Sequence, residues 1–146
     1  STAEVELEES DFTSLPDYNR LIASVSGTMR LSHGANGSEK LVLPRSTVYA
    51  FDGGIQTHCV GKARDLNLML RKGAAEGELV FVDSGTELNL EPAANETMLL
   101  FELESGNAAL CAGGNARLRC TANGQCALFT VRLVGEAIPD SDNRNG

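Results

Sequence analysis

Short runs in which apolar and polar residues alternate recur along the chain, and turn residues separate them. Residues 64–71 alternate strictly, with leucines on one face of a predicted strand and mainly polar residues on the other. The leucines are Leu66, Leu68 and Leu70, and the opposite face carries Asp65, Asn67 and Met69. This segment is therefore the best-defined predicted strand, and its polar face is the first candidate for a function.

The same pattern predicts strands in both halves of the sequence. They span 20–26, 28–33, 40–43, 46–51, 55–60, 63–70, 78–82, 86–90, 97–104, 108–111, 116–120 and 126–134. Turn signals such as Asp52-Gly53-Gly54, Gly113-Gly114 and Asn123-Gly124 separate them. Strands at this spacing, without a long helical period, predict an all-β antiparallel sandwich or barrel. We expect one β domain over 1–136 and a flexible tail over 137–146, which is rich in Asp and Asn.

The polar face of 64–71 has two interpretations. Asp and Asn are poor strand formers, so two of them on one face of a good strand need an explanation. Antiparallel sheets commonly expose one polar face to water, which would make this an outer surface. Alternatively the leucines fill an interface, and Asp65 and Asn67 line a cavity where they offer donors and acceptors to a small polar molecule. Met69 would then supply an adaptable apolar floor.

Composition and charge narrow the range of partners. The chain has 146 residues, 42% of them hydrophobic, and a formal net charge of −8. An acidic chain without a basic cluster is not suited to nucleic acid or an anionic membrane surface. The apolar runs are too short for a transmembrane helix, and no signal sequence opens the chain, so we expect a cytoplasmic protein.

Four cysteines, Cys59, Cys111, Cys120 and Cys126, are present without a C-x-x-C pair or a nearby histidine cluster. This spacing does not favour zinc. In the cytoplasm we expect reduced thiols, most of them buried, whereas an oxidising compartment would allow a disulfide among the last three.

Two segments resemble the HutD/Ves family of bacterial cupin-like proteins. Residues 12–27, Phe-Thr-Ser-Leu-Pro-Asp-Tyr-Asn-Arg followed by an apolar strand and Gly, are similar to the family pattern Phe-Ser-x-Phe-Pro-Gly-x-Asp-Arg. Phe51-Asp-Gly-Gly and the later Asp65-Leu-Asn-Leu-Met69 resemble Phe-x-Gly-Asp followed by Asp-Phe/Leu-Asn-x-Met. The resemblance runs from about residue 3 to residue 134, with only the strand rhythm matching in the second half.

The sequence departs from the family in two ways. Asp17 and Asn19 replace the usual Gly and Asp. The family also has a further N-terminal segment containing Trp-Lys-Asn-Gly-Gly, which this sequence lacks. The resemblance therefore implies a shortened member, a processed fragment or one piece of a larger chain.

The resemblance implies a two-lobed cupin-like β-barrel without a catalytic metal or cofactor. Family members are associated with histidine utilisation or stress, and a proposed role is to bind a small pathway metabolite such as formylglutamate. Cupin-like proteins often dimerise by sheet packing, which implies a homodimer here by analogy.

The histidines do not supply the set of metal ligands that is usual in cupin enzymes. Only His33 and His58 are present, without an H-x-H pair. Two histidines with Asp65 or Asp52 would be the one arithmetically allowed site, and the spacing does not favour it. We predict a surface position for His33 beside a turn. His58 either lines a pocket or is a hydrogen-bonded structural residue.

Arg20 opens the first strong strand, and its guanidinium could hold a ligand carboxylate through two hydrogen bonds. An ion pair with Asp17 or Asp65 is the alternative. Phe51 is either a core residue or, in the context of the family, an aromatic wall at the barrel mouth. Asp52 is most simply a turn residue whose carboxylate caps the backbone. The predicted ligand site thus comprises Arg20, Phe51, Asp52, His58, Asp65, Asn67 and Met69.

The sequence contains no motif that is typical of an activated nucleophile. No G-x-S-x-G motif occurs, and His58 and Cys59 point to opposite faces of a strand. The leading hypothesis is thus a non-catalytic protein that binds a small carboxylate or formyl-amino acid and senses or regulates amino-acid catabolism. A metal-poor cupin isomerase or hydrolase and a structural interaction module are the alternatives.

Overall fold

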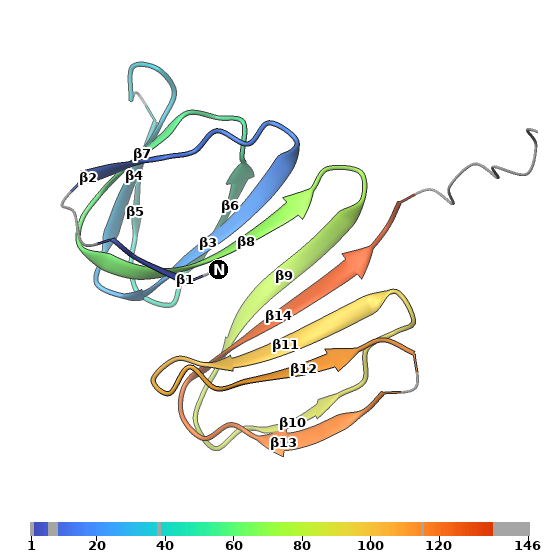
Figure 1. Ribbon diagram of the computed structural model, residues 1–146. Coiled ribbons are helices and arrows are strands. Elements are labelled where there is room, and N and C mark those ends of the chain that lie inside the picture. Colours follow the sequence, from blue (N-terminus) through green and yellow to red (C-terminus); the bar gives the residue numbers. More distant parts are fainter. Residues whose placement is uncertain (1, 6–8, 38, 115, 136–146) are drawn as a thin grey trace, which may run out of the picture.

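The computed structural model describes residues 2–5, 9–37, 39–114 and 116–135, and in these every regular element is a β-strand (Figure 1). The strands are β1 (Thr2–Val5), β2 (Glu9–Phe12), β3 (Tyr18–Ser26), β4 (Met29–His33), β5 (Glu39–Leu43), β6 (Val48–Asp52), β7 (Thr57–Val60), β8 (Ala63–Arg71), β9 (Ala75–Val82), β10 (Glu87–Leu90), β11 (Glu96–Glu102), β12 (Ala108–Ala112), β13 (Leu118–Thr121) and β14 (Cys126–Leu133). The described part of the chain contains no helix of the length and apolarity needed to cross a membrane. The predicted tail over 137–146 lies outside the described residues.

The strands form two lobes, which lie side by side in Figure 1 and are joined by the turn between β8 and β9. Lobe 1 comprises β1 to β8 in two four-stranded sheets, an inner sheet ordered β1-β8-β3-β6 and an outer sheet ordered β2-β7-β4-β5. Lobe 2 comprises a four-stranded inner sheet, β12-β11-β14-β9, and a two-stranded outer sheet, β10-β13. The named strands all pair antiparallel, as the all-β prediction requires.

Three apolar cores hold these four layers together. One fills lobe 1 and contains Ile22, Met29, Leu31, Leu43, Cys59 and Ala63. A second lies between the inner sheets of the two lobes and contains Ala23, Val25, Leu66, Leu79, Leu103, Ala127 and Phe129. The third fills lobe 2 and contains Leu90, Leu100, Cys111, Ala122 and Cys126. Because each inner sheet packs on both faces, its strands contribute alternate residues to two cores.

Each predicted strand is present, with ends displaced by up to three residues. The largest displacement is at β9, which begins at Ala75 and includes Glu76 and Gly77, residue types that disfavour strands. The sequence pattern did not predict β1 and β2, which pair with β8 and β7. Their short sequences contain several acidic residues, so tertiary pairing rather than local preference makes them strands.

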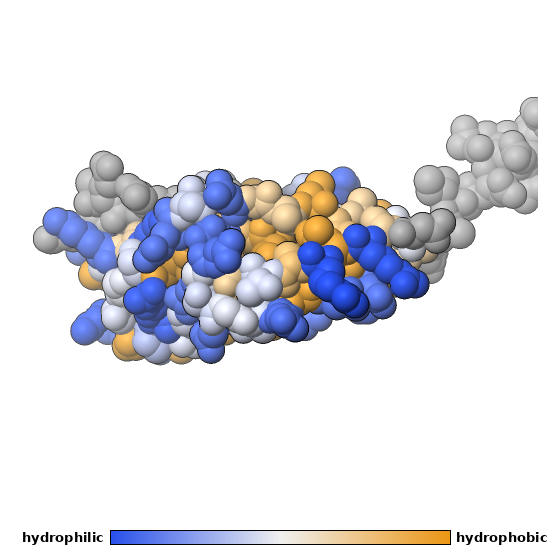
Figure 2. Space-filling view, turned by 90° about the horizontal axis from the view of Figure 1, so that it is seen from below, coloured by the Kyte–Doolittle hydropathy of each residue, from blue (hydrophilic) through white to orange (hydrophobic). Residues whose placement is uncertain are grey.

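The surface carries several exposed large apolar residues. Seen from below Figure 1, apolar residues gather in the middle of the molecule, with hydrophilic residues on both sides (Figure 2). The most exposed large apolar side chains are Leu110, Leu133 and Val42, at 68%, 65% and 57% exposure. All four cysteines are free thiols, and three of them are buried.

Candidate functional site

Alternation along β8 decides which way its polar residues face. Leu66 belongs to the core between the lobes and Leu68 packs against it, so Asp65 and Asn67 point the opposite way, into lobe 1. Both are buried, with 3% and 8% exposure. The structure thus places these two polar side chains in the protein interior rather than on the water-exposed surface.

Arg20 enters the same interior from β3. Its side chain is buried, and its guanidinium carbon lies 4.8 Å from the ring centre of Phe12 and 5.6 Å from that of Phe51. Nη1 donates a hydrogen bond to the Thr13 carbonyl at 3.3 Å, whereas Nε has no hydrogen-bond partner among the described residues. The guanidinium is therefore held by aromatic rings and has donor capacity to spare.

The predicted ion pairs of Arg20 are not formed among the described residues. None of the ion pairs within 4.0 Å includes Arg20, and Asp17 is exposed. Strand register explains the separation from Asp65, because Arg20 lies opposite Met69 while Asp65 lies opposite Ser24, four residues further along β3. Burial lowers the pKa of Arg20, and the more distant Asp65 carboxylate partly offsets this effect.

Asp65 is the negative counterpart of Arg20 among the buried polar residues of β3 and β8. Burial raises its pKa, and the charge of Arg20 opposes that rise without cancelling it. The carboxylate also affects Cys59, a fully buried thiol of β7. Burial and the Asp65 charge together raise the pKa of Cys59 to about 11, so this thiol is neutral and a poor nucleophile.

A second polar group in lobe 1 is centred on His33, and it corrects the prediction of a surface position. His33 is 5% exposed because it continues the inward face of β4 after Met29 and Leu31. Its Nδ1 lies 2.8 Å from Thr57 Oγ1 and its Nε2 lies 2.7 Å from the Tyr49 hydroxyl. The alternation with Met29 and Leu31 was the available signal, and the following glycine loop obscured it.

The hydrogen bonds assign the tautomer of His33. Thr57 Oγ1 donates a hydrogen bond to the Ile55 carbonyl at 3.1 Å, so it accepts one from His33 Nδ1–H. Nε2 then accepts a hydrogen bond from the Tyr49 hydroxyl. The Phe51 ring lies 5.1 Å from the His33 ring and 5.6 Å from the guanidinium of Arg20, so Phe51 separates the two polar groups.

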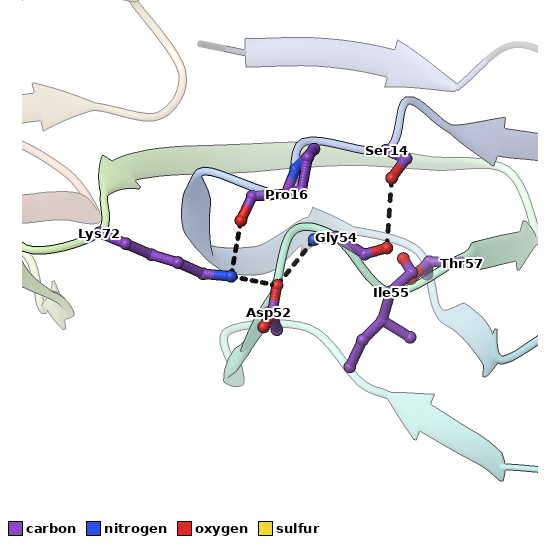
Figure 3. Close-up of polar contacts among 7 residues, drawn as sticks. All are labelled: Ser14, Pro16, Asp52, Gly54, Ile55, Thr57 and Lys72. Carbon is purple, nitrogen blue, oxygen red and sulfur yellow. Dashed lines mark hydrogen bonds and ion pairs between the residues drawn. The ribbon is translucent and has the colours of Figure 1, made fainter.

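Two turns and a lysine close the end of lobe 1 beside Arg20 (Figure 3). Asp52 Oδ1 accepts from the Gly54 amide and from Lys72 Nζ, at 2.8 Å and 2.7 Å. The same ammonium group donates to the Pro16 carbonyl at 2.7 Å, and Ser14 Oγ donates to the Gly54 carbonyl at 3.2 Å. Asp52 therefore acts as a turn residue that joins the two resemblance segments, and the hydrogen bond from Lys72 lowers its pKa.

Glycine at position 53 is required by the closeness of the two turns. A Cβ at Gly53 would lie 2.7 Å from the Tyr18 carbonyl oxygen and 2.8 Å from that of Leu15. It would also lie 3.3 Å from Cδ of Arg20. The glycine therefore fixes both the approach of the turns and the position of the arginine side chain.

His58 lies apart from this interior. Its side chain is on the outer face of lobe 1, where Nδ1 contacts Asp11 Oδ1 at 2.7 Å and Nε2 is 3.8 Å from Glu9 Oε2. His33 occupies the opposite, inward face of the same sheet. The two histidines cannot therefore ligate one metal ion, and His58 is not brought together with Arg20.

Met69 and Phe51 complete the predicted set. Phe51 packs against the core of lobe 1, next to Arg20 on the paired strand. Met69 is opposite Arg20 on the other side, but 40% of it is exposed, which places it at the rim of the lobe. Arg20, Phe51, Asp65 and Asn67 thus share the interior of lobe 1, Met69 lies at its rim, and Asp52 closes its end.

An open groove of about 690 Å³ lies between the lobes. The lobe 1 wall includes three residues of the predicted site, and the lobe 2 wall includes three carboxylates and an arginine. They are Arg20, Phe51 and Asp52 in lobe 1, and Glu76, Glu78, Glu96 and Arg132 in lobe 2. Arg132 forms an ion pair with Glu76 at 2.8 Å. The carboxylates make the lobe 2 wall unfavourable for an anionic ligand, in contrast to the surroundings of the Arg20 guanidinium.

Comparisons with known proteins agree with this architecture. A family model described as HutD matches residues 1–132. HutD from Pseudomonas fluorescens SBW25, in a structure described as a formate condition, is 24% identical over 88% of this chain and 75% of that chain, with a TM-score of 0.68. A conserved protein of unknown function from Pseudomonas aeruginosa PAO1, PA5104, is 27% identical over 89% of this chain and 79% of that chain, with a TM-score of 0.67. No curated protein matches the chain.

Proposed function

The chain belongs to the HutD family, and on that premise we propose that it is a non-catalytic protein that binds a small carboxylate or a formylated amino acid. The ligand site is the interior of lobe 1, where Arg20, Phe51, Asp65 and Asn67 come together. The observation that carries the proposal is the state of Arg20, a buried cation without a carboxylate within 4.0 Å among the described residues.

The physical argument concerns the free energy of a buried charge. Taking a guanidinium out of water costs several kcal/mol, on the order of the whole stability of a domain, unless a partner compensates it. Two aromatic rings and one carbonyl supply part of this compensation, and Nε has no described partner. An anion with two oxygens would complete it through paired hydrogen bonds. Arg20 is therefore the group that favours a carboxylate ligand.

The remaining residues give the ligand its chemical class. Asp65, inside the same lobe, disfavours a second negative charge near it and favours a ligand with a donor group. Asn67 can donate to and accept from a formyl or amide group. The structure of HutD from Pseudomonas fluorescens is described as a formate condition, and formate is the smallest carboxylate with which this ligand class can be tested. The finer role, sensing or regulating histidine catabolism in the cytoplasm, rests on family membership alone.

The test is calorimetric titration with formate, acetate and N-formylglutamate, and with the corresponding amides as uncharged controls. We expect binding of at least one carboxylate and at least tenfold weaker binding to Arg20→Met, which is about 1.4 kcal/mol. Arg30→Met is the matched control, because Arg30 is exposed on the outer sheet of the same lobe.

Two further measurements keep the result interpretable. The urea midpoint of Arg20→Met shows whether the variant is folded, and Arg20→Lys keeps the charge while losing the planar fork, so it should bind with intermediate affinity. Absence of binding by any carboxylate, or equal binding by wild type and a folded Arg20→Met, would contradict the proposal.

A further inference from the structure

The edge strands of the four sheets differ in how well they are protected against pairing with a strand of another chain. Free sheet edges in soluble proteins usually carry charged residues, proline or bulges, because an unprotected edge pairs with another chain. The edge strands other than β12, that is β1, β2, β5, β6, β9, β10 and β13, each contain at least one charged residue. Strand β12 has the sequence Ala-Ala-Leu-Cys-Ala and contains none.

The face of β12 that carries Leu110 is also apolar and open. Leu110 is 68% exposed, and Ala108 and Ala112 on the same face are exposed as well. The strand pairs with β11 on one side, and no backbone hydrogen bond joins its other side to a described residue. Both the edge and the adjoining face are therefore available to a partner.

This face continues the apolar core between the lobes. A row of four apolar residues crosses the inner sheet of lobe 2 through directly paired positions, namely Leu110, Leu99, Phe129 and Leu79. Phe129 and Leu79 are covered by lobe 1, with 7% and 4% exposure, whereas the β12 end of the row is uncovered. The row thus runs from a buried core to an open edge.

We propose that a second copy of this chain covers that edge, with β12 of each copy paired antiparallel about Leu110. In this register Leu110 faces its own counterpart, Ala108 faces Ala112, and Ala109 faces Cys111. Small residues thus oppose small residues around one central leucine, and the strand is complementary to itself under a two-fold rotation. The two inner sheets become one continuous sheet, and the apolar row extends across both copies.

The charge of the chain favours this edge over the others. Each copy carries a formal net charge of −8, so self-association through an acidic edge brings like charges together. At β12 the paired strands contribute no charge, and the repulsion acts only at the greater distance between the remaining surfaces. A second copy is therefore the partner that the sequence of β12 fits.

The experiment is sedimentation equilibrium of the full chain over a concentration series that reaches high micromolar. We expect wild type to be dimeric, and Leu110→Lys to dimerise at least tenfold more weakly, because two ammonium groups then face each other directly. Val42→Lys is the matched control, since Val42 is an exposed apolar residue on the edge strand β5 and should leave the dimer intact. The unfolding midpoints of both variants show that they remain folded.

Cross-linking tests the register independently. Leu110→Cys should form a covalent dimer on mild oxidation, whereas wild type and Val42→Cys should not, because the native thiols are buried or half-buried. A monomeric wild type at every concentration, or a folded Leu110→Lys that dimerises as tightly as wild type, would overturn the proposal. A dimer that Leu110→Cys fails to cross-link would overturn the register.

Discussion

The interiors of the two lobes differ in their chemistry, although both are built from antiparallel strands. The buried polar side chains of the described residues all lie in lobe 1, and they are Arg20, Ser24, His33, Thr57, Asp65 and Asn67. The interior of lobe 2 contains aliphatic residues and cysteine thiols. One interior is an apolar core, whereas the other combines an apolar core with charged groups.

The difference shows which lobe has features beyond those that folding requires. Burying polar groups costs free energy unless hydrogen bonds replace water, and a buried charge costs more. An apolar core such as that of lobe 2 avoids this cost, so stability alone would favour the same solution in lobe 1. Ser24, His33 and Thr57 have hydrogen-bond partners within the protein, so Arg20 is the buried group that the proposed carboxylate ligand would compensate. Five substitutions can separate packing from the proposed binding.

The largest effect is expected in the apolar interior of lobe 2. Leu100→Ala removes a buried side chain and leaves a cavity, so the free energy of unfolding should fall by about 2–5 kcal/mol. Urea denaturation gives this value, and calorimetry on the folded variant should show unchanged carboxylate binding. Loss of binding in a folded Leu100→Ala protein would show that the lobes do not divide stability and binding in this way.

A smaller effect is expected where the two turns close lobe 1. In Gly53→Ala the added methyl meets two carbonyl oxygens and the side chain of Arg20, so backbone and arginine must both shift. Overpacking of this kind typically costs about 1–3 kcal/mol. Gly135→Ala is the control, because its nearest neighbours would lie 4.0 Å from the new atom. Carboxylate binding should weaken in Gly53→Ala and remain unchanged in the control.

Loss of a hydrogen bond to His33 should lower the free energy of unfolding by a smaller amount. Tyr49→Phe removes the hydroxyl that donates to His33 Nε2, and the loss of one such bond costs about 0.5–1.5 kcal/mol. Tyr18→Phe removes a hydroxyl without a hydrogen bond among the described residues and should change the urea midpoint less. Equal midpoints for the two variants would mean that the His33 group does not stabilise lobe 1.

The sequence predicted the strands and the shared face of Asp65, Asn67 and Met69 on β8 because both depend on local alternation, and it left open whether that face meets water or a cavity. Once the leucines of β8 are assigned to an interface, the positions of Asp65 and Asn67 follow from the two-residue period of a strand. The apolar face of β4 could have placed His33 inside by the same argument. Its neighbour Gly34 suggested a turn at the surface instead.

Other features depend on contacts between segments far apart in the sequence. The ring of Phe12 reaches Arg20 because β2 pairs with β7, and β2 has no clear strand pattern. Lys72 joins Pro16 to Asp52 across three separate segments. Local patterns carry no information on such contacts, which explains why the surroundings of Arg20 and the role of Asp52 required the structure.

The smallest effect is a change in how stability depends on pH, and it has opposite signs at two carboxylates. The pKa of Asp65 is raised by burial, so the folded protein holds this proton after the unfolded chain has released it. The free energy of unfolding therefore falls as pH rises from the ordinary carboxyl pKa, about 3.9, to the raised value. Asp65→Asn removes this decrease and should gain stability relative to wild type across that window.

Asp52 provides the contrasting case, because the hydrogen bond from Lys72 lowers its pKa. Its contribution is present above the ordinary carboxyl pKa and is lost as pH falls through the lowered value, so Asp52→Asn should lose stability relative to wild type as pH rises. Urea denaturation of both variants at a series of pH values measures the two slopes. Slopes of the same sign would show that Asp65 is not held in a desolvated interior, which would remove the charged interior of lobe 1 that distinguishes it from lobe 2.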